Sequence, residues 1–408
     1  MQTHLIVGAG QAGGQAARTM RQCGFEGRII VVGEEPHPPH QRPPLSKAVL
    51  LGKVPPEKTH LFKAEWYAEN DVELRLRTQV TRVEADAHRL TLDDGSTLDY
   101  DKLLLATGAT LRRLEISGAE LPSVHYLRRI EDALALQSAF QGGTRLVVIG
   151  GGFIGLEVAA SARQLGCEVT VLEAADRLMG RAMDAWMGAY FERLHESHGV
   201  TVRLQQQVTE IVVDGDATKV VTADGAVAAD VIVAGIGIVP NDSLARQIGA
   251  EVDNGVVVDT QGRTDIADIF ACGDVACHHN SRFGRRLRLE SWENAQNQAI
   301  AAASTMCGEP AHYDPVPWFW TNQFDVNLQL AGMPPNWDSR VLRGDPDSGP
   351  FTVFYLAGNT IVACSAVNNA REMRSARTLI EQSVPVTAQQ LQDPETDLKV
   401  LAKEGAAQ

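Results

Sequence analysis

The first residues whose types and spacing could do chemistry are the glycines near the amino terminus. They form the pattern Gly8-x-Gly10-x-x-Gly13, which follows the apolar run HLIV and precedes an alanine-rich stretch. Glycines at this spacing permit a tight turn and let the backbone approach a pyrophosphate at the start of a helix. Glu34, about twenty residues beyond the motif, can accept hydrogen bonds from a ribose. The segment therefore predicts a dinucleotide site.

The same pattern occurs again in the middle of the chain. GGGFIG at residues 150–155 follows the run RLVVI, and Glu173 stands at the end of the next apolar run. A carboxylate at this position would repel the 2′-phosphate of NADPH, so NADH is the expected ligand. Arg177 and Arg181 follow closely and weaken this preference, unless they belong to a solvated helix face.

Two dinucleotide sites in one chain imply one tightly held cofactor and one that visits. A flavin beside a nicotinamide is the commonest such pair, because NADH delivers two electrons and flavin can release them singly. Gly273–Asp274 ends the apolar run IFAC and could place a carboxylate on the ribityl hydroxyls, although such a dipeptide alone is more often a turn. The expected cofactors are therefore FAD and NAD(H).

The cysteines argue against an enzyme that reduces disulfides. None of the six forms a CxxC pair or a zinc-like spacing. HQRPPLSK at residues 40–47, the segment expected to approach the flavin, contains no cysteine, whereas a thiol relay needs a reactive one there. We expect the cysteines to be reduced and mostly buried, and electrons to leave by another route.

The elements that must position these residues form a duplicated pattern. Each glycine motif lies between two apolar runs, of which the second are RIIVV at 28–32 and CEVTVL at 167–172. This β-α-β order predicts an α/β fold with two Rossmann-like dinucleotide-binding domains built on parallel sheets. Further apolar strands are expected at 101–110, 230–241 and 264–276, and they would make the first domain discontinuous.

The residues from 318 onward differ in character. WFWTNQ at 318–323 and alternating runs such as FTVFYLAG predict a small α+β domain with an antiparallel sheet, and the tail from Ser383 reads as helical and polar. The expected division is an FAD-binding domain at 1–110 and 238–317, an NADH-binding domain at 111–237, and a C-terminal α+β domain at 318–408.

Composition and charge exclude several classes of protein. The 408 residues, 44% of them hydrophobic, are enough for two or three domains with buried cores. A net charge of −14 removes a global basic footprint for nucleic acid and disfavours anionic membranes. The opening MQTHLIVGAG has no signal-peptide pattern, and the apolar run at 231–239 is too short to span a bilayer. We expect a cytoplasmic protein.

The motifs together resemble the NADH-dependent ferredoxin reductases of bacterial oxygenase systems, within the wider glutathione-reductase-like class of two-dinucleotide flavoproteins. The resemblance covers essentially the whole chain. It is carried by the segments GAGQAGG, RPPLSK, LLLATGA, YLRRIEDA, VVIGGGFIGLEVAA, AGIGIVPN, FACGDVA, LESWENAQNQ, WFWTNQ and VNNAREM. The segments WENAQNQ and VNNAREM are most similar to reductases of aromatic-ring dioxygenases. The resemblance implies electron transfer from NADH through FAD to a [2Fe-2S] ferredoxin.

The resemblance also implies roles for particular residues. Lys47 would pair with Glu157 near the flavin N5, and Trp320 would lie near the flavin edge where ferredoxin docks, unless Trp320 only packs the third domain. The implied FAD contacts are Gly8, Gly10, Ala12, Gly13, Glu34, Arg42, Pro44, Lys47, Val80, Ala106, Arg128, Asp274 and Trp292. The implied NADH contacts are Gly150, Gly152, Ile154, Gly155, Glu157, Glu173, Gly235, Gly237 and Glu290.

Other functions remain open at this point. A rubredoxin reductase, an NADH oxidase or quinone reductase, and an apoptosis-inducing-factor-like NADH sensor all share parts of the pattern. For a ferredoxin partner, which is generally acidic, docking on this acidic chain needs a local basic face. The candidates are two arginine groups, of which the second has helical spacing: Arg285, Arg286 and Arg288, and Arg371, Arg374 and Arg377.

Overall fold

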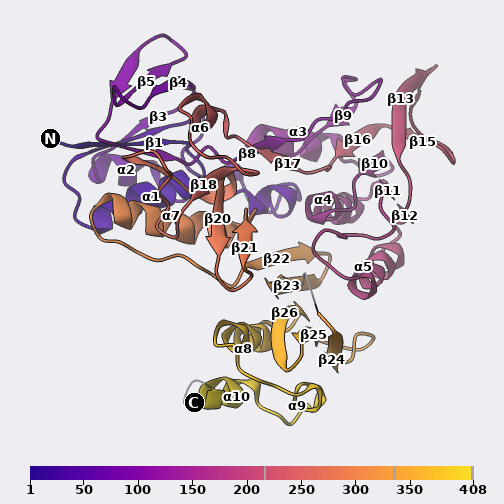
Figure 1. Cartoon of the computed structure of the whole chain (residues 1–408). Helices are drawn as coiled ribbons and strands as arrows, with labels where there is room; N and C mark the ends of the chain where they lie inside the picture. Colours follow the sequence, from indigo (N-terminus) through magenta and orange to yellow (C-terminus); the bar gives the residue numbers. More distant parts are fainter. Residues whose placement is uncertain (216, 334–336, 406–408) are drawn as a thin grey trace.

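The first glycine motif leads out of a parallel sheet with the strand order β19-β7-β1-β2-β3. The computed structural model describes residues 1–215, 217–333 and 337–405. Figure 1 shows this sheet near the amino terminus, with α1 and α7 side by side. The strands of this sheet are β1 (Thr3–Val7), β2 (Arg28–Val32), β3 (Val72–Arg75), β7 (Lys102–Leu105) and β19 (Ile269–Ala271).

This sheet is covered on both faces, which explains why its strands are continuous apolar runs. In β1, Ile6 points to a core shared with α1 and α7, whereas Leu5 and Val7 point to a core shared with two small sheets. The covering helices and strands are α1 (Gln11–Gln22), α7 (Trp292–Met306), β4 (Val80–Glu84), β5 (Arg89–Leu92), β6 (Thr97–Asp99), β18 (Val256–Val258), β20 (Ala276–Asn280) and β21 (Arg285–Leu287). Shorter elements nearby are α2 (Ala64–Glu69), α6 (Ser243–Gln247) and the 3-10 turns Pro43–Ser46, Pro56–Thr59 and Gly273–Val275.

The second glycine motif leads out of another parallel sheet, with the order β12-β11-β10-β16-β9. Its helices lie on one face, and the sheet β13-β14-β15 covers the other. Its elements are β9 (Val124–His125), α3 (Ile130–Ala139), β10 (Arg145–Ile149), α4 (Phe153–Gln164), β11 (Glu168–Leu172), α5 (Ala185–Ser197), β12 (Thr201–Arg203), β13 (Val208–Asp214), β14 (Ala217–Thr222), β15 (Gly225–Ala229) and β16 (Val231–Ala234). The predicted α/β class with two parallel-sheet units is confirmed.

The C-terminal region is an antiparallel sheet with the order β22-β23-β26-β25-β24, as predicted. One face packs on helices, which Figure 1 shows on the side away from the other sheets, and the opposite face joins the core of α4 and α5. The elements are β22 (Trp318–Gln323), β23 (Val326–Gly332), β24 (Ser339–Gly344), β25 (Phe351–Ala357), β26 (Thr360–Val367), α8 (Ala370–Glu381), α9 (Ala388–Gln392) and α10 (Leu398–Gly405).

All three of the expected long strands are shorter in the structure, and the segment at 230–241 divides into β16 and β17 (Ile238–Pro240). The apolar segment at 101–110 divides into β7 and β8 (Ala109–Leu111), because the chain leaves the parallel sheet and pairs antiparallel with β17. The segment at 264–276 keeps only β19, since Asp268 adopts a positive φ before it and a 3-10 turn follows. The paired strands β8 and β17 are the two places where the chain crosses between the two parallel sheets. Among the described residues, no helix is long and apolar enough to cross a bilayer.

Candidate functional site

Both glycine motifs open into one cavity of about 1370 Å³. The cavity is lined by the turn after β1, the turn after β10, the 3-10 turn Pro43–Ser46, the start of α7 and strand β22. A single cavity that reaches both motifs could hold two ligands next to each other.

The first motif is shaped to receive the backbone or phosphates of a ligand. Gly8 has φ +118°, and a Cβ there would lie 2.1 Å from the carbonyl oxygen of Ala106, so only glycine fits. Gly10 caps α1 without a side-chain hydrogen bond, and a Cβ on it would meet nothing within 4 Å. The first amides of α1 are therefore accessible from the cavity, as a pyrophosphate would require. The residues fit a dinucleotide.

The second motif repeats this geometry. Gly150 has φ +107°, and a Cβ there would lie 2.6 Å from the carbonyl oxygen of Gly235. Gly152 caps α4, and a Cβ on it would meet nothing within 4 Å. Glu173 is held by the turn of the glycine motif and by its own loop: one oxygen accepts the Gly151 amide at 2.6 Å, and the other accepts the Ala175 amide at 2.7 Å. Its carboxylate is thus fixed at the end of β11, beside the motif.

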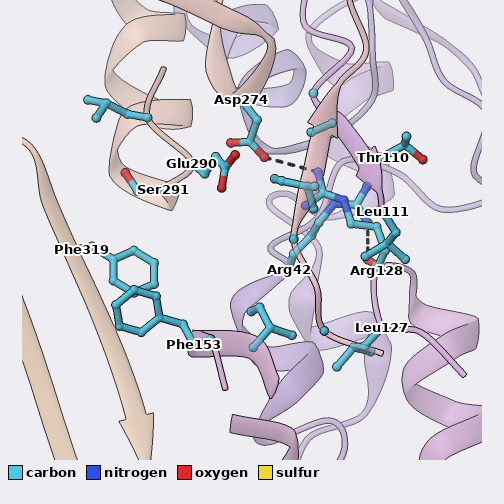
Figure 2. Close-up of a pocket in the computed structure, with 18 of the residues that line it drawn as sticks. Arg42, Thr110, Leu111, Leu127, Arg128, Phe153, Asp274, Glu290, Ser291 and Phe319 are labelled. Carbon is cyan, nitrogen blue, oxygen red and sulfur yellow. Dashed lines mark hydrogen bonds and ion pairs between the residues drawn. The ribbon is translucent and has the colours of Figure 1, made fainter. Parts of the chain in front are cut away.

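A cluster of charges lies beside the first motif. The guanidinium of Arg42 donates to Glu35 and to the carbonyl of Arg128, each at 2.5 Å, and Arg128 contacts Asp274 at 3.3 Å. Figure 2 shows Arg42, Arg128 and Asp274 together on one side of the cavity. Burial alone would raise the pKa of Glu35, but the charge and hydrogen bond of Arg42 lower it overall. Burial also lowers the pKa of Arg128, which stays charged because guanidinium does not deprotonate in proteins.

Lys47 and Glu157 both line the cavity and join the 3-10 turn Pro43–Ser46 to α4. The Lys47 Nζ lies 2.7 Å from Glu157 Oε2, and the Glu157 side chain is only 1% exposed. The turn that carries Lys47 is fastened to α4, because the hydroxyl of Ser46 donates to Glu157 and the hydroxyl of Ser161 donates to the Ser46 carbonyl. A largely buried ammonium–carboxylate pair therefore links the turn beside the first sheet to the helix that follows the second motif.

Aromatic side chains form the wall near the C-terminal domain. Trp320 stacks on Trp318 with ring centroids 5.2 Å apart and meets Trp292 edge-on at 5.9 Å. Phe319 packs against Phe153 at 4.5 Å, and Figure 2 shows these two rings facing each other across from the arginines. The tryptophans are half-buried, so Trp320 both packs in the domain and borders the cavity.

Most of the predicted site residues line this cavity, but two do not. Gly13 instead packs α1 on the first strand, since a Cβ there would lie 1.9 Å from the Gly8 carbonyl. Pro44 accepts the amides of Lys47 and Val49 and so shapes the turn. Glu34 is half exposed and lies 3.6 Å from Arg129. The roles of all these residues toward FAD and NADH stay predictions.

Several residues of the site were not predicted from the sequence. Glu35 stands next to the predicted Glu34, but it is the one that binds Arg42. Ser46 lies inside the motif RPPLSK, where only its neighbours were singled out. Thr321 donates to Glu157 across 164 residues of sequence, at 2.7 Å, and no local pattern signals such a contact.

The six candidate docking arginines are not equivalent. Three of them are ion-paired and are not free charges, which corrects the expectation for each group. These are Arg286 with Glu251 and Asp253, Arg288 with Glu290, and Arg377 with Glu293 and Glu381. Within the described parts of the chain, Arg285, Arg371 and Arg374 are exposed and form no ion pair.

The cysteines near the cavity have thiols of low reactivity. Cys272 and Cys364 line it, but both thiols are buried, and burial raises the pKa of Cys272 to about 12. Burial also raises the pKa of Cys364. A thiol with a raised pKa is a poor nucleophile at neutral pH, so these residues are unsuited to a disulfide relay.

Two nucleotide-type sheets that share one cavity, with a third domain closing it, define a two-dinucleotide flavoprotein reductase. Family models agree: residues 2–299 match the pyridine nucleotide-disulphide oxidoreductase family, and residues 318–402 match the reductase C-terminal family. The chain therefore belongs to the pyridine nucleotide-disulphide oxidoreductases, in the branch of ferredoxin–NAD(+) reductases that its relatives define.

The relatives match over almost the whole length. The chain is 44% identical to rhodocoxin reductase of Rhodococcus erythropolis, covering 97% of this chain and 93% of the relative. It is 43% identical to the ferredoxin–NAD(+) reductase component of the anthranilate 1,2-dioxygenase system of Burkholderia cepacia, covering 97% and 98%. Among solved structures, the reductase in the covalent putidaredoxin reductase–putidaredoxin complex superposes with a TM-score of 0.96 at 37% identity, covering 100% and 99%.

Proposed function

We propose that this protein is an NADH:ferredoxin oxidoreductase that passes electrons from NADH through FAD to a [2Fe-2S] ferredoxin of an oxygenase system. The observation that carries the proposal is the shared cavity, which both glycine motifs and the Lys47–Glu157 pair line. When bound, the flavin couples a two-electron hydride donor to a one-electron acceptor. An aromatic-ring-hydroxylating dioxygenase is the oxygenase that we propose, in keeping with the names of several relatives.

In this proposal the chain binds FAD and NADH, orients them within one cavity and shields that cavity from solvent. Residues 1–110 and 238–317 hold FAD through the first motif, Arg42, Arg128 and Asp274, and residues 111–237 hold NADH through the second motif and Glu173. The paired crossings β8 and β17 support these boundaries. Residues 318–408 close the cavity through β22 and present Trp320 toward ferredoxin. The fixed carboxylate of Glu173 favours NADH over NADPH, and a cytoplasmic location fits the use of NADH and the free cysteines.

The acceptor can be tested directly. NADH oxidation by the purified holoenzyme should be faster with the ferredoxin encoded beside its oxygenase than with oxygen alone. We expect a factor of about 100, equivalent to about 2.7 kcal/mol of activation free energy. Equal rates with and without ferredoxin would instead identify an NADH oxidase.

We also propose where ferredoxin docks. Arg371 and Arg374 are exposed on α8, and Arg377, one turn beyond Arg374, is bound to Glu293 beside Trp292. The two unpaired arginines thus belong to the helix that is fastened near the tryptophans. Reversing both charges (R371E/R374E) should lower ferredoxin-coupled turnover about tenfold at low salt, because steering between opposite charges raises the association rate.

Two comparisons make this docking test decisive. Turnover with ferricyanide should stay at the wild-type rate, and the loss should shrink at high salt, where the Debye length falls to about 3 Å. Arg82→Glu on β4 is a control for charge reversal elsewhere on the surface. Its side chain is 67% exposed, although it pairs with Glu84, and Figure 1 shows β4 at the opposite end of the molecule from α8. Parallel losses with both acceptors would mean that the arginines are structural.

A further inference from the structure

Strand β22 has two faces with different partners. Successive side chains of a strand point to opposite faces, so Trp318 and Trp320 share one face, and Phe319, Thr321 and Gln323 share the other. Each residue of the second face contacts the unit that carries the second glycine motif. Phe319 packs on Phe153, Thr321 donates to Glu157, and Gln323 bonds to His195 of α5.

These contacts form a continuous buried chain of hydrogen bonds. His195 Nε2 lies 2.8 Å from Gln323 Oε1, Gln323 Nε2 lies 3.3 Å from Thr321 Oγ1, and Thr321 Oγ1 lies 2.7 Å from Glu157 Oε1. The side chains are at most 2% exposed. Each bond is donated in the direction from His195 toward Glu157. The amide oxygen of Gln323 can only accept, and the Glu157 carboxylate, which is paired with Lys47, is the final acceptor.

The state of His195 is compatible with this direction. Burial lowers the pKa of His195 to about 4, against the opposing effect of its hydrogen bond to Gln323. The ring is therefore neutral at neutral pH, with its proton on Nε2, where the acceptor lies. The bond from His195 fixes the orientation of the Gln323 amide, so its NH2 group donates to the Thr321 hydroxyl. The hydroxyl oxygen of Thr321 is then an acceptor toward Gln323, and its own proton is donated to Glu157.

We propose that Thr321 is a positioning residue for the Glu157–Lys47 pair, and that Gln323 and His195 fix the direction of its hydroxyl. The proposal rests on the function proposed above. Glu157 has two oxygens: Oε2 receives Ser46 and Lys47, and Oε1 receives Thr321. Lys47 already lies at hydrogen-bond distance, 2.7 Å, from Oε2. Without the Thr321 donor, more of the negative charge of the buried carboxylate is left uncompensated, and it offsets more of the positive charge of Lys47. Thr321 thereby keeps the positive charge available to the cavity.

The test is the reduction of enzyme-bound FAD by NADH in stopped flow, which needs no ferredoxin. Thr321→Val keeps the shape and removes the donor. We expect the limiting reduction rate to fall about tenfold while the NADH dissociation constant stays within about threefold. The flavin equilibrium should shift about tenfold toward the oxidised form, about 30 mV for a two-electron couple. Thr321→Ser keeps the hydroxyl and should restore the rate to within about threefold of wild type.

A matched control exists in the same sheet. Thr352 of β25 is fully buried and donates to the carboxylate of Glu372, also at 2.7 Å. Thr352→Val therefore removes the same kind of bond away from the cavity and should leave both the reduction rate and the potential unchanged. Gln323→Met, which removes the donor to Thr321, should slow reduction about threefold and covers the case in which Thr321→Val does not fold.

The outcomes separate the possible explanations. Wild-type rate and potential in Thr321→Val would overturn the proposal, and so would a Thr321→Ser enzyme as slow as Thr321→Val, because packing would then be the cause. If Thr321→Val does not fold, a wild-type rate in Gln323→Met overturns it. A wrong assignment of the acceptor would leave all these results intact, since only NADH and the flavin take part.

Discussion

Replacing Lys47 by methionine is expected to slow the reduction of FAD by NADH about 100-fold, the scale found when one preorganised charge-stabilising donor is removed. The side chain of Lys47 is 18% exposed, lies 2.7 Å from Glu157 and lines the cavity that both glycine motifs share. An ammonium in this place stabilises negative charge that develops during reduction, and the low-dielectric surroundings strengthen the effect. Stopped-flow absorbance of the flavin measures the rate.

The single substitution also leaves a buried carboxylate without its cation, which by itself destabilises a protein by about 3–5 kcal/mol. The double variant K47M/E157Q separates these two effects. It should recover stability toward urea but remain slow in flavin reduction. Lys219→Met, which breaks an exposed pair with Asp214, should change neither quantity. If K47M alone reduces its flavin at the wild-type rate, the pair is only structural.

Lowering the pH from 7 to 5 is expected to reduce the free energy of unfolding by about 5 kcal/mol. Four histidine rings are almost fully buried: His4, His40, His195 and His278. Burial lowers the pKa of the first three to about 4, assisted by Lys102 at His4 and by Arg42 at His40. Burial also lowers the pKa of His278. Below pH 6.5 these histidines bind protons in the unfolded chain but stay neutral in the folded chain. The stability that is present above pH 6.5 is therefore lost progressively as the pH falls to 4.

Urea unfolding of the holoprotein at several pH values measures this slope. His4 is the most informative position, because its ring stacks on Phe25 and neither ring nitrogen has a hydrogen-bond partner among the described residues. His4→Leu should remove about 2 kcal/mol of the loss between pH 7 and 5, while His312→Gln, at an exposed ring, should leave the pH dependence unchanged. A pH-independent free energy between pH 7 and 5 would contradict the assignment of these rings as buried neutral groups.

Local sequence patterns were sufficient for the fold class and both nucleotide motifs. A glycine that lies against a carbonyl, such as Gly8 against Ala106, must be a glycine whatever the rest of the chain does, so its spacing can be read directly. The apolar runs before each motif likewise reflect strands buried on both faces. The same logic failed at residues 101–110, where one apolar run serves two sheets and only the pairing of β8 with β17 divides it.

The sequence by itself determined two dinucleotide-binding units and the antiparallel C-terminal sheet, because each depends on residues close together in the chain. Only the tertiary structure decided which charges are free and what holds Glu157. Arg377 is neutralised by Glu293, 84 residues away, and Thr321 reaches Glu157 across 164 residues. Such contacts depend on how the C-terminal sheet packs on α4 and α5, which no local pattern specifies. Burial of that interface lowers the local dielectric constant and so strengthens its hydrogen bonds and charge interactions.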